Sequence, residues 1–187
     1  FPLILSSRGF AVALAVGNQH SCVVLANGTV QCWGEGASGR LGDGAVTNNT
    51  TPSPVSNLTD ATQVAAGSDF TCARRSGGTV VCWGSSARGR LGNNAVTNQL
   101  TPVAVSNLTN VVQITAGTAH ACAIVASGQA YCWGEGGSGR LGNNSVANQL
   151  VPVAVSGLSN AVQIEAGDNF TCAVRSNQSA VCWGYNG

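Results

Sequence analysis

The chain of 187 residues contains no lysine, and only 8% of its residues are charged, against about 25% in an average soluble protein. Its formal net charge is +1, so it lacks the basic surface that attracts nucleic acid or anionic lipid. It also lacks any uninterrupted apolar run approaching the roughly 18 residues of a membrane-spanning helix. We therefore expect no nucleic-acid partner and no membrane insertion.

Cysteine is abundant and regularly placed. Eight cysteines form four pairs with nine residues between the members, and each pair follows the previous one by fifty residues. Zinc ligands usually stand closer together, so disulfides are favoured over a metal site, and no metal or cofactor is expected. Disulfides form in oxidising compartments, which predicts an extracellular location, secreted or at the cell surface. The predicted disulfide residues are Cys22, Cys32, Cys72, Cys82, Cys122, Cys132, Cys172 and Cys182.

The rest of the sequence keeps the same period. Short strand signals bounded by Gly, Pro and Asn dominate, and no long helical pattern occurs, so the fold is predicted to be all-β. The apolar segment 10–16 resembles the core of a signal peptide, but its repeat position predicts a strand. Because the first residue is Phe1, we expect a processed chain or a fragment. The recurring positions are Pro2, Pro52, Pro102 and Pro152, Gly17, Gly67, Gly117 and Gly167, and Gly-Arg-Leu-Gly at 39–42, 89–92 and 139–142.

Each cysteine pair is predicted to close a β-hairpin. In the third copy the strands are 120–125 and 129–134, joined by a three-residue turn that ends in Gly128. This closure places Cys122 opposite Cys132, and it sets the large Trp133 opposite a small residue. A shift by one residue would turn the cysteines to the wrong face.

Four strands in about fifty residues, repeated in tandem, are typical of a β-propeller blade. An open β-solenoid is the alternative, although its coils usually contain only about 20–30 residues. We predict a single repeat array over 1–187 of about four blades, each with four antiparallel strands. The approximate blades are 1–50, 51–100, 101–150 and an incomplete 151–187.

Three motifs of the third copy together suggest a family. They are Gly117-x-x-His120-x-Cys122-Ala123, then Gly128-x-x-Tyr131-Cys132-Trp133-Gly134, and then the segment 139–142. The sequence resembles the regulator-of-chromosome-condensation repeat, in the cysteine-bearing form of secreted bacterial proteins. The resemblance implies a propeller, usually of seven blades, that binds proteins. Known members of the family include guanine-nucleotide exchange factors and a bacterial inhibitor of β-lactamase.

The chain departs from the family pattern in three ways. Arginine replaces the usual glutamine of the Gly-Gln-Leu-Gly motif, and four copies are fewer than the usual ring. The first strand is degenerate, with Arg8 where the other copies carry leucine, and the last copy lacks its Gly-Arg-Leu-Gly motif.

The copies also alternate. Copies one and three carry His and then Gly-Glu-Gly, whereas copies two and four carry Phe-Thr-Cys and then Arg. This suggests the duplication of a two-blade unit, which closes in a ring of four, six or eight blades but not of seven.

No catalytic constellation is recognisable, so we expect no enzyme. His20 and His120 share a strand position with phenylalanines, which favours packing. The acids are scattered, and Asp69 and Asp168 are expected to form turns rather than to bind calcium.

The recurring arginines are the candidate partner-binding residues. In a propeller, Arg40, Arg90 and Arg140 would lie on a circle, where their guanidinium groups would bind carboxylates of an acidic partner. Alternatively, each arginine hydrogen-bonds carbonyls of the neighbouring blade connection. Asn-x-Ser/Thr sequons are candidate glycosylation sites if the host modifies them. They begin at Asn27, Asn48, Asn49, Asn57, Asn107, Asn143 and Asn177.

These observations suggest a non-catalytic, secreted propeller that binds proteins or serves as a structural or assembly module of the extracellular space. The partner is expected to be a protein, or a further copy bound head to tail through open blade edges. Carbohydrate binding or surface adhesion is the alternative, and guanine-nucleotide exchange is disfavoured because the cysteines indicate an extracellular location.

Overall fold

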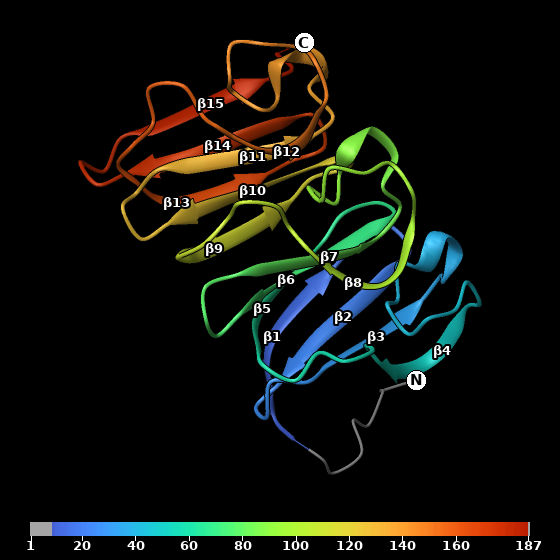
Figure 1. The fold of residues 1–187 in the computed structure, drawn as a ribbon. Helices are drawn as coiled ribbons and strands as arrows, with labels where there is room; N and C mark the ends of the chain where they lie inside the picture. The colour runs from blue at the N-terminus through green and yellow to red at the C-terminus, as the bar shows by residue number, and fades with distance from the viewer. Residues whose placement is uncertain (1–8, 187) are drawn as a thin grey trace.

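The computed structural model describes residues 9–186, which form an all-β array of four antiparallel sheets (Figure 1). The predicted fold class is confirmed. The repeat positions Pro2 and Arg8 lie outside the described residues. Of the described residues, none belongs to a helix with the length and apolar character needed to cross a membrane.

The four sheets are named blades 1 to 4 in chain order, and in each blade the strands pair in sequence order from the inside outward. Blades 1 and 2 contain β1 (Ala11–Val16), β2 (His20–Leu25), β3 (Val30–Gly34), β4 (Asn49–Pro54), β5 (Ala61–Ala66), β6 (Phe70–Arg75), β7 (Val80–Gly84) and β8 (Gln99–Ala104). Blades 3 and 4 contain β9 (Val111–Ala116), β10 (His120–Val125), β11 (Ala130–Gly134), β12 (Gln149–Ala154), β13 (Ala161–Ala166), β14 (Phe170–Arg175) and β15 (Ala180–Gly184). Single 3-10 turns follow the third strand of the first three blades: η1 (Ala37–Gly39), η2 (Ala87–Gly89) and η3 (Gly137–Gly139).

The predicted hairpin register is confirmed in all four blades. Cys122 pairs with Cys132 across β10 and β11, Trp133 faces Ala121, and the equivalent pairs occur in the other hairpins. All four cysteine pairs are disulfide-bonded. The period of the sequence and the length of the turn therefore determine the pairing of the two middle strands.

The aromatic residue that begins each hairpin packs against the glycine of the turn before it. A Cβ atom added to Gly117 would lie 2.5 Å from the imidazole of His120, and one added to Gly67 would lie 2.1 Å from the ring of Phe70. The recurring turn glycine is therefore required by this close approach. The strand glycine that pairs with this residue across the hairpin, Gly134 in the third copy, has only backbone atoms as its nearest neighbours.

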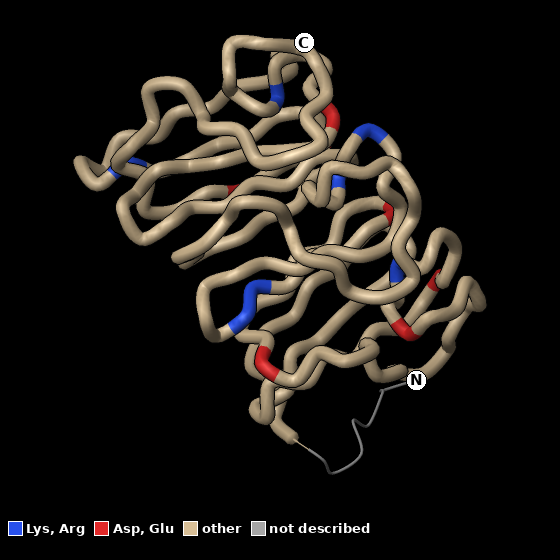
Figure 2. The backbone as a smooth tube through the Cα atoms, in the orientation of Figure 1, with Lys and Arg blue, Asp and Glu red and all other residues tan. Residues whose placement is uncertain are grey.

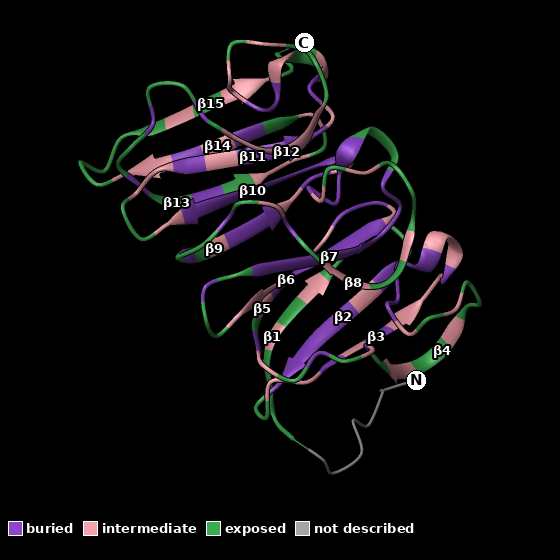
Figure 3. Ribbon diagram, in the orientation of Figure 1, coloured by how far each residue is buried: buried purple, intermediate pink, exposed green. Residues whose placement is uncertain are grey.

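The hydrophobic core lies between the blades rather than inside one of them (Figure 3). In the junction of blades 1 and 2, the disulfide Cys22–Cys32 packs against Val64, Ala73 and Trp83 of the next blade. The junctions of blades 2 and 3 and of blades 3 and 4 repeat this arrangement. The first three disulfides therefore supply apolar surface to the following blade as well as closing their own hairpins.

A glutamine clamp joins the inner strands of successive blades. The side-chain amide of Gln63 donates to the carbonyl oxygen of Ile114 at 2.9 Å, and its oxygen accepts from the N–H of the same residue at 3.0 Å. Gln113 makes the same two bonds to Ile164. The clamp thus uses a side chain to pair the free backbone edge of an inner strand. Blade 1 has no clamp to blade 2, because Ala13 stands where the later blades carry glutamine.

Candidate functional site

One face of the array carries all of its long loops. Because neighbouring strands are antiparallel, the turns that join the first two strands of each blade open on the same side as the connections between the third and fourth strands. We call this side the loop face; it comprises the inner turns 17–19, 67–69, 117–119 and 167–169 and the loops 35–48, 85–98 and 135–148. The three 3-10 turns mark it in Figure 1.

The Gly-Arg-Leu-Gly motif forms a socket for the tryptophan of the next blade. The indole N–H of Trp133 donates to the carbonyl oxygen of Arg90 at 3.1 Å. Leu91 is buried in the same apolar cluster. Gly92 has a positive φ of 64°, and a Cβ atom there would lie 2.9 Å from the indole. The same bond joins Trp83 to Arg40 and Trp183 to Arg140.

The candidate partner-binding arginines are almost completely buried, at 4 to 7% exposure. The guanidinium of Arg40 donates to the carbonyl oxygens of Ala37 and Ser68. It also pairs with Glu35 at 2.9 Å and with Asp69 at 3.0 Å. Arg90 and Arg140 bond the carbonyl three residues earlier in the same way. The structure therefore engages these side chains within the array, mostly through carbonyls of their own loops rather than of the neighbouring blade connection.

The ion pairs continue along the loop face, where basic and acidic residues are interspersed (Figure 2). Asp69 also contacts Arg90 at 3.3 Å, and Glu135 pairs with Arg140 at 3.2 Å and with Arg88 of the preceding blade. Burial by itself would raise the pKa of Glu135, but these arginines hold it below its ordinary value. Burial lowers the pKa of Arg90, while Asp69 opposes that effect. Glu35 and Asp69 are more exposed than Arg40, at 31% and 43% for their side chains against 5%. In the Arg88–Glu135 pair the order is reversed, at 54% for Arg88 and 19% for Glu135.

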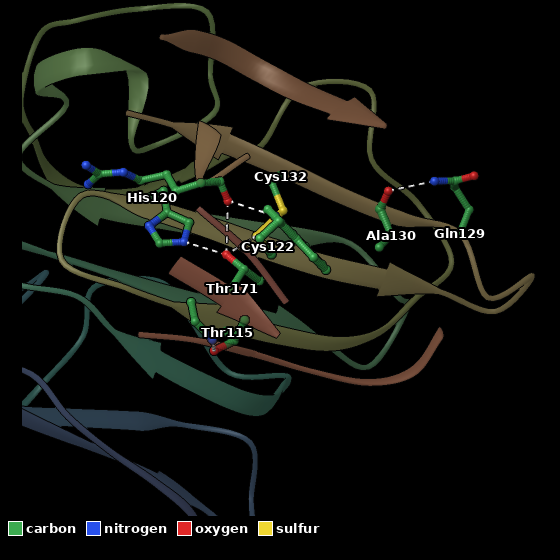
Figure 4. Close-up of a disulfide and its surroundings, with 10 residues drawn as sticks. Thr115, His120, Cys122, Gln129, Ala130, Cys132 and Thr171 are labelled. Carbon is green, nitrogen blue, oxygen red and sulfur yellow. Dashed lines mark hydrogen bonds between the residues drawn. A yellow bond between two sulfur atoms is a disulfide. The ribbon is translucent and has the colours of Figure 1, made fainter. Parts of the chain in front are cut away.

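Each histidine bonds a threonine of the next blade (Figure 4). The ring nitrogen Nε2 of His120 lies 2.8 Å from the Thr171 hydroxyl, which donates its own proton to the carbonyl oxygen of Arg140. Nε2 must therefore donate, which leaves Nδ1 as a buried acceptor without a partner. His20 and Thr71 repeat this arrangement below Arg40. Burial, together with the charge of the nearby arginine, lowers the pKa of each histidine to about 4.

These contacts give the alternation of the copies a physical cause. Between blades 1 and 2 and between blades 3 and 4, a histidine meets a threonine. Between blades 2 and 3, Phe70 takes the histidine position and Ala121 the threonine position, in an apolar cluster. The first residue of each hairpin is therefore matched in type to the second hairpin residue of the next blade, fifty-one positions later.

The tips of the three long loops expose one valine each. Val46, Val96 and Val146 hold the same repeat position and are 57%, 61% and 70% exposed. The loops that carry them are anchored: the side-chain oxygen of Asn48 accepts from the N–H of Gly36, and the equivalent asparagines do the same. Sequence reasoning missed these valines, although their fifty-residue recurrence was a visible signal.

The inner turns surround a small depression of about 180 Å³ at the axis of the array. Asn18 donates to Ser68, and Thr118 donates to Asp168. Asp69 and Asp168 thus both lie in inner turns, where each has a protein partner. Within residues 9–186, no group of three or more His, Cys, Asp or Glu residues is placed to hold a metal ion.

The asparagines of the predicted sequons lie in turns, loops or at the start of β4. Asn27 and Asn177 accept from the backbone N–H two residues later, which shapes their hairpin turns. Asn49 donates to Asp43. The remaining sequon asparagines are Asn48, Asn57, Asn107 and Asn143.

Family models match most of the chain. The model of the Regulator of chromosome condensation (RCC1) repeat matches residues 27–74, 77–124 and 127–174. A second model of the same description matches residues 11–40, 61–90 and 111–140. No curated protein matches the chain in sequence.

Solved structures with the same fold include human WBSCR16 and yeast Prp20. WBSCR16 is 24% identical over 98% of this chain, with a TM-score of 0.86. Prp20p from Saccharomyces cerevisiae, whose structure was described with its binding properties to Gsp1p and histones, is 27% identical over 92% of this chain, with a TM-score of 0.80. Prp20 in a complex with Kap60 is 26% identical over 92%, with a TM-score of 0.79. The chain spans only 50%, 44% and 43% of these three structures.

These relatives contradict the functional interpretation made from the sequence. That interpretation was a module of the extracellular space, with carbohydrate binding or adhesion as the alternative. The similar structures are instead RCC1-type proteins, and the partners recorded for Prp20 are Kap60, Gsp1p and histones. The cysteine pattern was the source of the error, because a disulfide reports the redox conditions of folding and carries no information about the partner.

The tryptophan socket predicts that Gly92→Ala will destabilise the array. The new methyl group would meet the buried indole of Trp133, and the positive φ disfavours any side chain, so we expect a loss of about 2–4 kcal/mol. Thermal unfolding followed by tryptophan fluorescence measures it. Gly77→Ala is the matched control, because nothing lies within 4 Å of the added methyl. Equal unfolding temperatures for the two variants would contradict the socket.

The histidine contacts predict a loss of stability in acid. The folded pKa of about 4 lies below the ordinary 6.5, so the unfolded chain binds more protons and stability falls as the pH drops from 6.5 to 4. Each histidine contributes roughly 3 kcal/mol to this loss, measured as urea unfolding at pH 7, 5.5 and 4.

The control for this prediction copies the apolar junction. Replacing His120→Phe together with Thr171→Ala reproduces the Phe70 and Ala121 pair. This variant should lose about half of the pH dependence, and an unchanged slope would show that the histidines do not cause it.

Proposed function

The chain belongs to the regulator of chromosome condensation (RCC1) repeat family, and we propose that it acts by holding a partner protein on its loop face. The observation that carries this proposal is the row of exposed valines on anchored loops. Val46, Val96 and Val146 stand at equivalent tips, and the loop backbone beneath them is fixed by hydrogen bonds. A preorganised surface with apolar anchors binds without the cost of ordering mobile loops.

The charges of the loop face favour a partner of particular chemistry. Arg40 and Arg90 lie beneath the surface, while the carboxylates of Glu35 and Asp69 that pair with them are partly open to solvent. An exposed carboxylate accepts hydrogen bonds from lysine and arginine side chains. We therefore propose a partner that offers basic and apolar side chains, for which histones serve only as a chemical probe, and a binding role rather than a catalytic one.

The binding proposal predicts that three loop-tip substitutions will weaken partner binding. The variant Val46→Asn, Val96→Asn, Val146→Asn should bind core histones at least about ten-fold more weakly than the native chain, because each change removes an apolar anchor without adding a charge. Biolayer interferometry with immobilised chain measures it, and Gsp1p serves as the second probe.

The control places the same three polar side chains on the opposite face. Ser76, Ala126 and Ser176 are exposed in the hairpin turns, and their replacement by Asn should leave binding unchanged. Equal weakening in both triple variants would refute the loop face as the site. The absence of binding to either probe by the native chain would refute the proposed partner chemistry.

The location of the protein is a separate proposal. We propose that the chain folds in an oxidising, extracellular compartment, and the motivation is its four disulfides. Protein taken from its natural source and alkylated without reductant should show no modified cysteine by intact mass. Eight alkylated cysteines would contradict this location.

A further inference from the structure

The junction between blades 1 and 2 lacks the glutamine clamp that joins the later blades. Gln63 bonds both backbone groups of Ile114, the residue fifty-one positions later, and the junction of blades 3 and 4 repeats these bonds. The equivalent residue of blade 1 is Ala13, whose methyl side chain can neither donate nor accept a hydrogen bond. The backbone of Val64, which holds the position of Ile114 in blade 2, therefore receives no clamp from blade 1.

Val64 presents the same two backbone groups in the same direction as the clamped residues. In an antiparallel pair, the N–H and C=O of one residue point either both toward the partner strand or both away from it. Ile114 pairs with Ala123 and directs both groups away from β10, where the clamp bonds them. Val64 pairs with Ala73 in the equivalent register, so its N–H and C=O also point to the free edge of β5.

The surroundings of this edge are apolar. Val64 is 5% exposed, and Ala13 packs against the buried cluster that joins blades 1 and 2. Polar backbone groups in such surroundings take a hydrogen-bonding partner, because leaving them unpaired costs free energy. The inner edge is nevertheless open to approach, since the side chains that clamp it elsewhere, Gln63 and Gln113, are only half-buried.

From the two clamped junctions and the one without a clamp, we infer that the edge of β5 at Val64 is a binding site for a carboxamide. The occupant is the side chain of a glutamine from a partner protein. Its amide oxygen accepts from the N–H of Val64 and its amide nitrogen donates to the carbonyl oxygen, as Gln63 does at Ile114 at 3.0 and 2.9 Å. A carboxylate has no donor for that carbonyl oxygen. The site is separate from the loop face and does not depend on the function proposed for it.

Hydrogen exchange of single amides, followed by NMR on the native chain, tests whether the edge is open. The N–H of Val64 should exchange at least about ten-fold faster than those of Ile114 and Ile164, because only the latter two are bonded by a glutamine. Gln63→Ala should raise the exchange rate of the Ile114 N–H toward that of Val64. Equal protection of Val64 and Ile114 in the native chain would overturn the proposal, because another group would already hold the edge.

Acetamide is the probe for the ligand, because Ala13 and acetamide together contain the heavy atoms of a glutamine side chain. The titration extends to about 0.1 M, since so small a ligand binds weakly. Acetamide should shift the NMR resonance of the Val64 N–H and slow its exchange. Acetate and N,N-dimethylacetamide, which lack the donor, should do neither. No response to acetamide, or an equal response to dimethylacetamide, would overturn the carboxamide site.

The variant Ala13→Gln supplies the same group from within the chain. It should protect the Val64 N–H as Ile114 is protected, raise the unfolding temperature and abolish the response to acetamide. Ala13→Glu is the matched control, because its carboxylate has the same shape but cannot donate to the carbonyl oxygen of Val64. Circular dichroism checks that both variants fold. An Ala13→Gln chain that is no more stable than Ala13→Glu, or that still responds to acetamide at Val64, would overturn the proposal.

Discussion

The indole N–H of each buried tryptophan donates to an arginine carbonyl forty-three residues earlier in the chain, and the arrangement of the blades depends on this contact. A single sheet of this size has two faces and cannot bury either alone. The socket places the largest side chain of one blade over the loop of the preceding blade, between its leucine and its second glycine. The disulfide of the preceding blade belongs to the same apolar cluster. The socket also fixes the loop that forms it, and therefore fixes the exposed surface of that loop.

The loop face follows from that arrangement. The backbone carbonyl of each arginine is fixed by the tryptophan below, and its guanidinium is fixed by local carbonyls and by acids. Such buried charges gain stability only when they are fully paired, which explains why Asp69 serves two arginines where Ser85 replaces the glutamate of the neighbouring copies. The exposed valines stand on this fixed base. Surface chemistry and blade packing therefore share the same short segment of sequence.

The hairpins could be predicted in detail because their determinants are local: a ten-residue cysteine spacing, a three-residue turn, and a small residue opposite each tryptophan. The contacts between blades could not be predicted, because the contacting residues lie about fifty positions apart and the sequence shows them only as recurring residue types. Gln63 was visible within a strand pattern, but nothing in that pattern shows that its amide clamps Ile114. The arginines were singled out as partner-binding residues, whereas in the structure their carbonyls accept from the tryptophans and their guanidinium groups are buried and bonded within the array. The location was inferred from the cysteines, and that location was then used to predict an extracellular role. The sequence held no evidence for this second step.

Each disulfide joins cysteines ten residues apart within one hairpin, so the described cross-links never connect one blade to another. Under tension along the chain, the covalent staples would protect the inside of each blade, and the junctions would part first. The array would then lengthen in steps of one blade. Each step would be shorter than a fully extended blade, because the disulfide keeps the segment between its two cysteines closed. In this respect the described blades are separately cross-linked units that, apart from the connecting backbone, are held to one another only by non-covalent contacts.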